Sequence, residues 1–275
     1  MKSTPALPLQ QHPSFAAALG RLGQQVDIHP LPHAAPLLSI RRFGLRFASR
    51  GPIWMTDAPI DARVTSLRQS HLRLVNTDSK EPKTLRRAGF RLIHTAGSVA
   101  ELDLTDTEGG LLTRAHGKWR NIWRRSQSSA LRYHRERFAP HKHGWLLDAD
   151  TQQQKQKGYR ALPHSIIRAY AAENPKDVVV YSAGRKGTAI AGMLFLLHHP
   201  VATYHIGWTS AEARQDGAHH RMLMDAASHL AQRGFTRLDL GQVDTDTAPG
   251  LARFKIGTGA VIRPLGGTWL KIPGL

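Results

Sequence analysis

The residues best suited to chemistry lie in the last third of the chain. Gly217-Ala218-His219 precedes a helical pattern that ends near Arg233-Gly234, and the short strand pattern Leu238-Asp239-Leu240-Gly241 follows it. The segment Gly250-Leu251-Ala252-Arg253-Phe254-Lys255 comes next. Helix N-termini and glycine-rich turns present backbone N–H groups that bind anions, and a lysine adds a cation to them. This order of elements predicts a site that can hold a polyanionic carrier of an acyl group.

The overall charge also indicates an anionic partner. The 275 residues include 38 Lys and Arg against 20 Asp and Glu, which gives a formal net charge of +18 at pH 7. A field of this sign attracts nucleic acid, nucleotide conjugates or an anionic membrane surface. The alternative interpretation is a basic surface that is merely well solvated.

Cysteine and histidine usage limits the chemistry further. The chain has no Cys, which excludes disulfides and thiolate catalysis, and the doublets His198-His199 and His219-His220 lack the spacing of metal ligands. We therefore expect neither a metal nor a permanently bound cofactor. The N-terminus resembles no signal peptide, and the longest apolar run, Ala189 to Leu197, is shorter than the ~18 residues of a membrane span. We expect a cytoplasmic protein.

The most basic segment runs from Arg114 to Lys142, with nine Lys or Arg and only one acid, Glu136. A helix there would carry an apolar stripe of Trp119, Ile122, Trp123 and Ala130. Its other face would carry three cations spaced by seven residues, Lys118, Arg125 and Arg132. Because almost no acids interrupt these cations, we favour contact with phosphates over a simply solvated face.

Hydrophobic patterning indicates a mixed α/β fold of the α+β type. The second half is expected to contain a hairpin of Val178–Ser182 and Thr188–His198, a strand at Val201–Trp208, a helix at Ala218–Gln232, a strand at Thr236–Leu240 and closing strands within Val261–Ile272. The first half shows short strands around one or two helices. Together these elements predict mixed sheets with helices packed on them.

Several segments resemble one known family. Lys118-Trp119-Arg120-Asn121, Asp239-Leu240-Gly241 and Gly250-Leu251-x-x-Phe254-Lys255-x-Gly257-x-Gly259 are similar to the Fem (FemABX) peptidyltransferases and their shorter relatives in the GNAT superfamily. Arg50–Trp54 and Leu85–Phe90 extend the resemblance into the first half. It implies tandem GNAT-like domains, which we place at residues 1–110 and 111–275, with a linker within 105–117. The second domain would be catalytic.

The resemblance also implies an activity. In this family a primary amine attacks an activated acyl group, carried by aminoacyl-tRNA in Fem proteins and by coenzyme A in other GNAT enzymes. The Phe-Lys motif of the family falls on Phe254 and Lys255, so Lys255 would bind donor phosphate or stabilise the developing oxyanion. The alternative is a surface lysine beside a core phenylalanine.

One departure from the acetyl-CoA pattern bears on the donor. Acetyl-CoA enzymes use the loop Arg/Gln-x-x-Gly-x-Gly/Ala, and Arg214 and Gly217 match its first two fixed positions. The candidate phosphate-binding residues of this loop are Arg214, Gly217, Ala218 and His219. His219 stands where a small residue would let the backbone approach phosphate. This departure and the charge favour aminoacyl-tRNA as the donor, with acyl-CoA as the alternative.

The sequence assigns no general base. Asp239, interpreted as lying at a strand end, and His205, next to Tyr204 on the strand expected to border the acyl group, join Phe254 and Lys255 as candidate catalytic residues. The alternatives are a structural aspartate and a histidine satisfied within the sheet. The acceptor would be a small-molecule, peptide or lipid amine. Two rival interpretations are a non-catalytic nucleic-acid-binding module on the same scaffold and a peripheral enzyme that acylates a lipid amine without inserting into the membrane.

Overall fold

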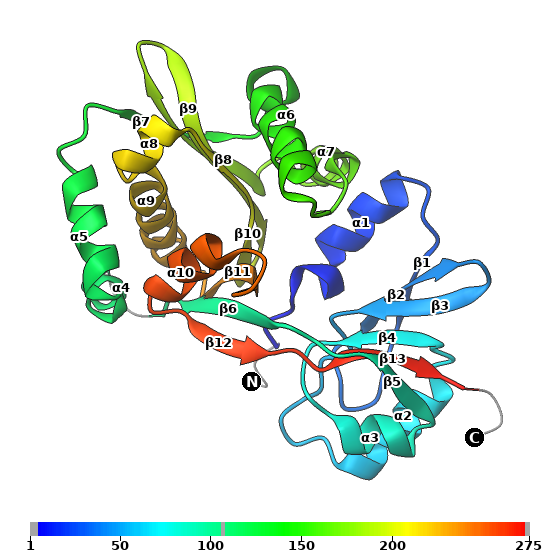
Figure 1. Ribbon diagram of the computed structural model, residues 1–275. Coiled ribbons are helices and arrows are strands. Elements are labelled where there is room, and N and C mark those ends of the chain that lie inside the picture. The colour runs from blue at the N-terminus through cyan, green and yellow to red at the C-terminus, as the bar shows by residue number, and fades with distance from the viewer. Residues whose placement is uncertain (1–4, 106–107, 273–275) are drawn as a thin grey trace. The chain divides into compact units, whose positions relative to one another are not determined.

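The computed structural model describes residues 5–105 and 108–272 and divides into two compact units (Figure 1). The first comprises Met1–Ser98 with Arg263–Leu275, and the second comprises Val99–Ile262. The boundary after Ser98 comes earlier in the chain than the boundary that we expected between residues 110 and 111. The C-terminal strand belongs to the first unit, although we placed it in the second domain. Residues 106–107 of the expected linker lie outside the described residues. No helix in the described ranges has the length and apolar character to cross a membrane.

The first unit is built on a six-stranded sheet in the order β1-β2-β3-β4-β13-β5. Its strands are β1 (Val26–His29), β2 (Leu37–Arg42), β3 (Leu45–Ser49), β4 (Leu74–Thr77), β5 (Phe90–His94) and β13 (Gly267–Lys271). Its helices are η1 (Leu9–Gln11), α1 (Pro13–Arg21), α2 (Ile60–Gln69) and α3 (Pro82–Arg87). The parallel pair β3–β4 needs a crossover connection, which contains α2.

The last strand joins this sheet because its side chains complete the core. β13 pairs antiparallel with β4 on one side and with β5 on the other. Trp269 of β13 is 2% exposed and packs with Val75, Leu72 and Phe90. Burial of a tryptophan between two strands removes a large apolar area from water, which stabilises the pairing of segments far apart in the chain.

The second unit is built on a seven-stranded sheet in the order β12-β6-β11-β10-β9-β8-β7. Its strands are β6 (Ser98–Asp103), β7 (Arg132–Arg137), β8 (Val178–Arg185), β9 (Thr188–His198), β10 (Val201–Thr209), β11 (Arg237–Val243) and β12 (Val261–Pro264). Its helices are α4 (Glu108–Arg114), α5 (Gly117–Ser126), α6 (Pro140–Lys157), α7 (His164–Glu173), α8 (Ala211–Gln215), α9 (Ala218–Gln232) and α10 (Pro249–Gly257). The expected mixed α/β fold and the β8–β9 hairpin are confirmed.

Helices cover both faces of this sheet. Helix α9 lies on one side of strands β8–β10, and α6 and α7 lie on the other (Figure 1). Met222, Leu223 and Leu230 of α9 are buried in the main core with Phe195 of β9. On the other face, α6 approaches β9 closely, since a Cβ atom at Gly192 would lie 2.7 Å from the Trp145 ring. Strand β9 is therefore buried on both faces, as its continuous apolar run indicates.

The basic segment 114–142 is not one helix. Helix α5 ends at Ser126, and Arg132 begins β7, which pairs with β8 at the edge of the sheet. The expected common helical face of Lys118, Arg125 and Arg132 is therefore wrong. The segment 132–137 pairs with the apolar strand β8, and this tertiary contact outweighs the helical spacing of the three cations. Charged side chains are common on edge strands, and β7 is at the edge of the sheet. Helices α4, α6, α8 and α10 also cover segments for which we expected no helix.

Candidate active site

The ladder between two neighbouring strands of the second sheet, β10 and β11, is open toward its end, because the strands stop pairing before either of them ends. The parallel ladder between β10 and β11 joins Val201–Thr203 to Arg237–Asp239, although β10 continues to Thr209 and β11 to Val243. The register of β10 against β9 shifts between Tyr204 and Ile206, so His205 is the extra residue of a β-bulge. A bulge bends its strand. The β10–β11 ladder thus ends next to the bulge, toward the carboxyl ends of both strands, where α/β sheets commonly bind ligands.

Lys255 and Asp239 lie beside this opening. Asp239 is inside β11 and not at its end, and its Oδ1 accepts a 2.7 Å hydrogen bond from the Gly241 N–H. Lys255 of α10 is 5% exposed, and its Nζ donates to the Gln242 carbonyl at 2.7 Å. A Cβ atom at Gly241 would lie 3.7 Å from that Nζ. The structure thus brings the predicted Lys255 and Asp239 to the same region of β11.

Burial changes the acid–base behaviour of this lysine. Desolvation lowers the pKa of Lys255 to about 8, while the nearby charge of Asp239 acts in the opposite direction. The ammonium therefore remains mainly protonated at neutral pH. Burying a cation costs free energy unless the cation is paired and hydrogen-bonded. Residues with strongly shifted pKa values are common at functional sites.

Aromatic packing holds the Lys255 helix in place. The Trp119 Nε1–H donates to the Phe254 carbonyl at 3.1 Å, and its ring lies 4.9 Å from that of His220 between centroids. His220 in turn lies 5.1 Å from Phe254. A Cβ atom at Gly257 would lie 2.7 Å from Trp119 Cδ1, so α5 and α10 are in close contact. Trp119 therefore connects the two segments that carry the family resemblance.

The start of α9 is an uncapped helix N-terminus next to α5. Gly217 occupies the N-cap position with φ of 71°, and no side chain caps the helix. The first N–H groups of such a helix suit an anion. A Cβ atom at Gly217 would lie 2.9 Å from Ile122 Cγ2, so α5 covers the glycine itself. Gly217 and Ala218 are both buried.

His219 is not available as a phosphate-binding cation at neutral pH. Its Nε2 lies 2.9 Å from the Trp208 carbonyl oxygen, and its ring is 6.0 Å from that of Phe254. Burial lowers the pKa of His219 to about 4. The side chain therefore fills the space between β10 and α10 as an uncharged ring.

The cations predicted to bind phosphate lie on three different elements, α5, β7 and α8. Lys118 and Arg214 are exposed on α5 and α8, and Arg132 is exposed on β7. The Arg125 Nη2 donates to the Gln215 carbonyl at 3.2 Å, which ties α5 to the loop before α9. Only Lys118 and Arg125 share a helix, α5, because Arg132 lies on β7 and Arg214 on α8.

The salt dependence of tRNA binding tests these cations. Each phosphate contact contributes roughly −0.7 to −0.9 to the slope of log K against log salt. Replacing Lys118, Arg125 and Arg132 by Gln is expected to flatten the slope by about two units, measured by filter binding. The matched control replaces Lys80, Lys83 and Arg86, which are exposed in the first unit, and is expected to leave the slope unchanged. Equal slopes for the two triple variants would contradict a phosphate-binding role.

Sequence reasoning missed a buried carboxylate–imidazole pair. Asp150 of α6 is 4% exposed, and its Oδ2 lies 2.8 Å from His164 Nε2 at the start of α7. Gln154 donates to the same oxygen at 2.7 Å. His164 lines a cavity of about 450 Å³ together with Tyr159 and the segment that joins α6 to α7. No local signal reveals this pair, because it depends on the contact between α6 and α7.

This pair lies close to the bulge of β10. The Gln153 side chain of α6 donates to the Gly207 carbonyl at 3.3 Å. Burial lowers the pKa of His205 to about 4, while the charge of Asp150 acts to raise it. His205 is thus an uncharged imidazole that lies close enough to Asp150 and His164 for their charges to influence its pKa. A histidine oriented by a carboxylate at the wall of a cavity can accept a proton from a bound amine.

One known family matches more than half of the chain. The model of the acetyltransferase (GNAT) domain family matches residues 79–255, so its match ends at Lys255. The chain belongs to this family and is a GNAT-type acyltransferase. A comparison with curated proteins finds no match.

Solved structures share the fold at low sequence identity. The crystal structure of FemX has a TM-score of 0.78 and 14% identity, covering 98% of this chain and 94% of that chain. L-PGS from Bacillus licheniformis has a TM-score of 0.61 and 14% identity, covering 92% and 86%. The C-terminal domain of a putative lysylphosphatidylglycerol synthetase from Agrobacterium fabrum has a TM-score of 0.58 and 16% identity, covering 96% and 89%. The predicted resemblance to a Fem-like fold is confirmed.

Proposed function

We propose that this enzyme transfers an aminoacyl group from aminoacyl-tRNA to a primary amine. The observation that carries the proposal is the buried ammonium of Lys255 beside the opening between β10 and β11. A cation held there in advance stabilises negative charge as it develops on a reacting acyl group. The net charge of +18 supports a large polyanion as the carrier.

The reaction forms one amide bond and breaks one ester bond. The acceptor nitrogen attacks the acyl carbon, and the carbonyl oxygen becomes an oxyanion that the Lys255 ammonium stabilises. Collapse of the tetrahedral intermediate releases the terminal ribose oxygen of tRNA, which takes up a proton. The attacking amine loses a proton to a base, so that atoms and charge balance.

The arrangement around α9 supports tRNA over coenzyme A. Gly217 is covered by Ile122, and His219 is an uncharged ring that fills space next to Phe254. Both features limit close approach of a pyrophosphate to the start of the helix. Acyl-CoA remains the alternative donor, because it is the thioester that GNAT enzymes of the resembled superfamily use.

We assign the role of general base to His164, with Asp150 as the residue that orients it. Their 2.8 Å contact fixes the imidazole at the wall of a cavity large enough for a small amine. The cavity is lined by α6, α7 and their connection, and these helices lie opposite α9 on the sheet. Donor and acceptor would thus approach the opening from opposite faces.

The acceptor class is decided by experiment. Small-molecule, peptide and lipid amines are the three classes to compare in transfer assays. The name lysylphosphatidylglycerol synthetase, carried by one structural neighbour, supports including a lipid acceptor. Transfer to none of these amines, together with intact tRNA binding, would favour the non-catalytic module.

The donor preference is tested by binding and transfer. Acetyl-CoA is expected to bind with Kd above ~100 μM, equivalent to about −5.5 kcal/mol or weaker, in calorimetry. Charged tRNA is expected to bind at low micromolar Kd in moderate salt and to lose its labelled aminoacyl group to an amine. Tight acetyl-CoA binding without transfer from tRNA would make the protein an acetyl-CoA-dependent amine acetyltransferase.

A further inference from the structure

The first unit contains a basic cavity that acyl transfer does not use. Its volume is about 520 Å³, and its lining residues are Arg41, Gly44, Arg46, His71, Leu72, Arg73 and Lys271. The cations come from β2, from β3, from Arg73 just before β4 and from the end of β13, so segments far apart in sequence converge on the cavity. All of them belong to the first unit.

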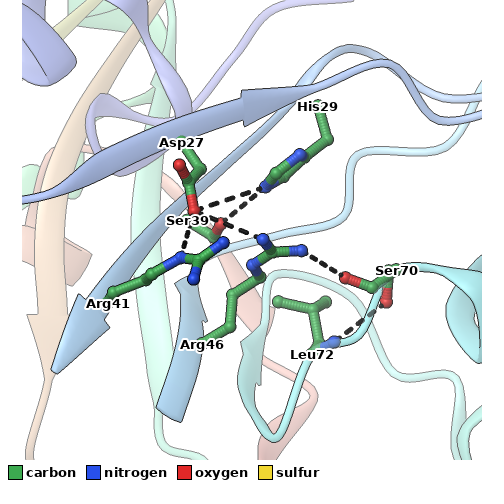
Figure 2. Close-up of polar contacts among 7 residues, drawn as sticks. All are labelled: Asp27, His29, Ser39, Arg41, Arg46, Ser70 and Leu72. Atoms are coloured by element: carbon green, nitrogen blue, oxygen red, sulfur yellow. Dashed lines mark hydrogen bonds and ion pairs between the residues drawn. The ribbon is translucent and has the colours of Figure 1, made fainter. Parts of the chain in front are cut away.

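One carboxylate orients two of these guanidinium groups (Figure 2). Asp27 Oδ2 accepts from Arg41 Nε at 2.9 Å and from Arg46 Nη2 at 3.4 Å. The Nη1 of Arg46 donates to the Ser70 carbonyl at 3.1 Å. The hydrogen bond from Arg41 and the charges of Arg41 and Arg46 hold the pKa of Asp27 below its usual range. The guanidinium groups are therefore held in position before any ligand arrives.

The other two cations carry charge that no acid balances. Lys271 and Arg73 are half-buried, and neither forms an ion pair within residues 5–105 and 108–272. The Lys271 Nζ donates to the Arg68 carbonyl at 3.1 Å and lies 5.7 Å from the centre of the Phe90 ring. Burial, with the charges of Arg73 and Arg68, lowers the pKa of Lys271. Four cations thus surround the cavity, and within the described residues Asp27 is the one carboxylate that pairs with any of them.

We propose that this cavity binds the phosphate or diphosphate group of a small soluble molecule. Guanidinium groups form paired hydrogen bonds with phosphate oxygens, and a lysine adds a point charge. The volume falls within the range of small-molecule sites. A concave site in which Arg46, Arg73 and Lys271 are half-buried suits a compact anion better than a flat membrane surface, and Leu72 is the one large apolar residue of its lining.

Calorimetry with sodium pyrophosphate tests the proposal on the full-length protein. Wild type is expected to bind one pyrophosphate saturably. The double variant R73Q/K271Q removes two charge-assisted contacts, so its Kd is expected to rise on the order of a hundredfold. The control R42Q/K83Q removes the same charge from exposed positions outside the cavity and is expected to keep the wild-type Kd within about twofold.

Three results would overturn the proposal. Wild type would fail to bind pyrophosphate saturably, both double variants would weaken binding equally, or only flotation with phosphatidylglycerol vesicles would depend on Arg73 and Lys271. The first excludes the site, the second indicates diffuse charge, and the third indicates a lipid headgroup. If the double variant does not fold, R73Q alone replaces it, and R73K is expected to retain most of the affinity because it keeps the charge.

Discussion

Replacing Lys255 with Ala is expected to lower kcat about a hundredfold. The ammonium is buried beside the opening between β10 and β11, where the acyl oxygen would become negative. Removing one preorganised donor to an oxyanion raises the barrier by about 3 kcal/mol. The measurement is single-turnover transfer from labelled aminoacyl-tRNA, which separates the chemical step from donor binding.

Two companion variants separate charge from packing. Lys255→Met keeps most of the side-chain volume but no charge, and it is expected to lose as much activity as Lys255→Ala. Lys118→Ala removes an exposed cation from the neighbouring helix α5 and is expected to change kcat less than threefold at saturating donor. A folded Lys255→Ala protein with wild-type turnover would disprove the assignment.

The pH profile provides an independent readout of the same lysine. Its pKa of about 8 means that about nine-tenths of the protein carries the cation at pH 7 and about one-tenth at pH 9. Activity is therefore expected to fall as the pH rises through about 8. Lys255→Arg retains its charge over this range, so whatever activity it keeps should not show that fall.

Replacing His164 with Ala is expected to lower kcat by a factor of about 10² to 10⁴, the usual contribution of a general base. The imidazole accepts the proton of the attacking amine, and Asp150 holds it in position at 2.8 Å. Asp150→Asn keeps the shape of the pair but loses the negative charge, so a smaller decrease is expected. The measurement is kcat against pH with a fixed amine acceptor.

Controls for His164 distinguish catalysis from packing. His141→Ala removes an exposed histidine from helix α6 and is expected to leave kcat unchanged. Added imidazole is expected to restore part of the activity of His164→Gly, because the small base can occupy the vacated space. If added imidazole restores no activity and the pH profile of the His164 variants matches that of wild type, the role of His164 is structural.

The C-terminal motif shows what short-range sequence patterns determine. Phe254 and Lys255, which their resemblance to the Fem family singled out, lie in α10 of the second unit, and the Lys255 Nζ donates to the Gln242 carbonyl of β11. The apolar run Thr188–His198 and the turn before it formed the expected hairpin. Such patterns are legible because turn formation and strand alternation depend on residues only a few positions apart.

The basic segment shows where local patterns fail. Seven-residue spacing groups Lys118 with Arg125 and Arg132, but β7 pairs with β8 and takes Arg132 out of the helix. The choice between helix and strand was made by an apolar partner strand more than forty residues along the chain, as the pairing of Arg137 with Val179 illustrates. Tertiary contacts of this kind override propensity.

The sequence by itself determined the mixed α/β class, the family resemblance, the excess of positive charge and the candidate Lys255. The tertiary structure decided that β13 completes the first sheet, that Asp150 meets His164, and that Arg41, Arg46, Arg73 and Lys271 surround one cavity. The physical reason is that closing a long loop adds little entropic cost per residue, so many distant pairings compete. Burial of side chains such as Trp269 selects among them, and that selection depends on the whole core.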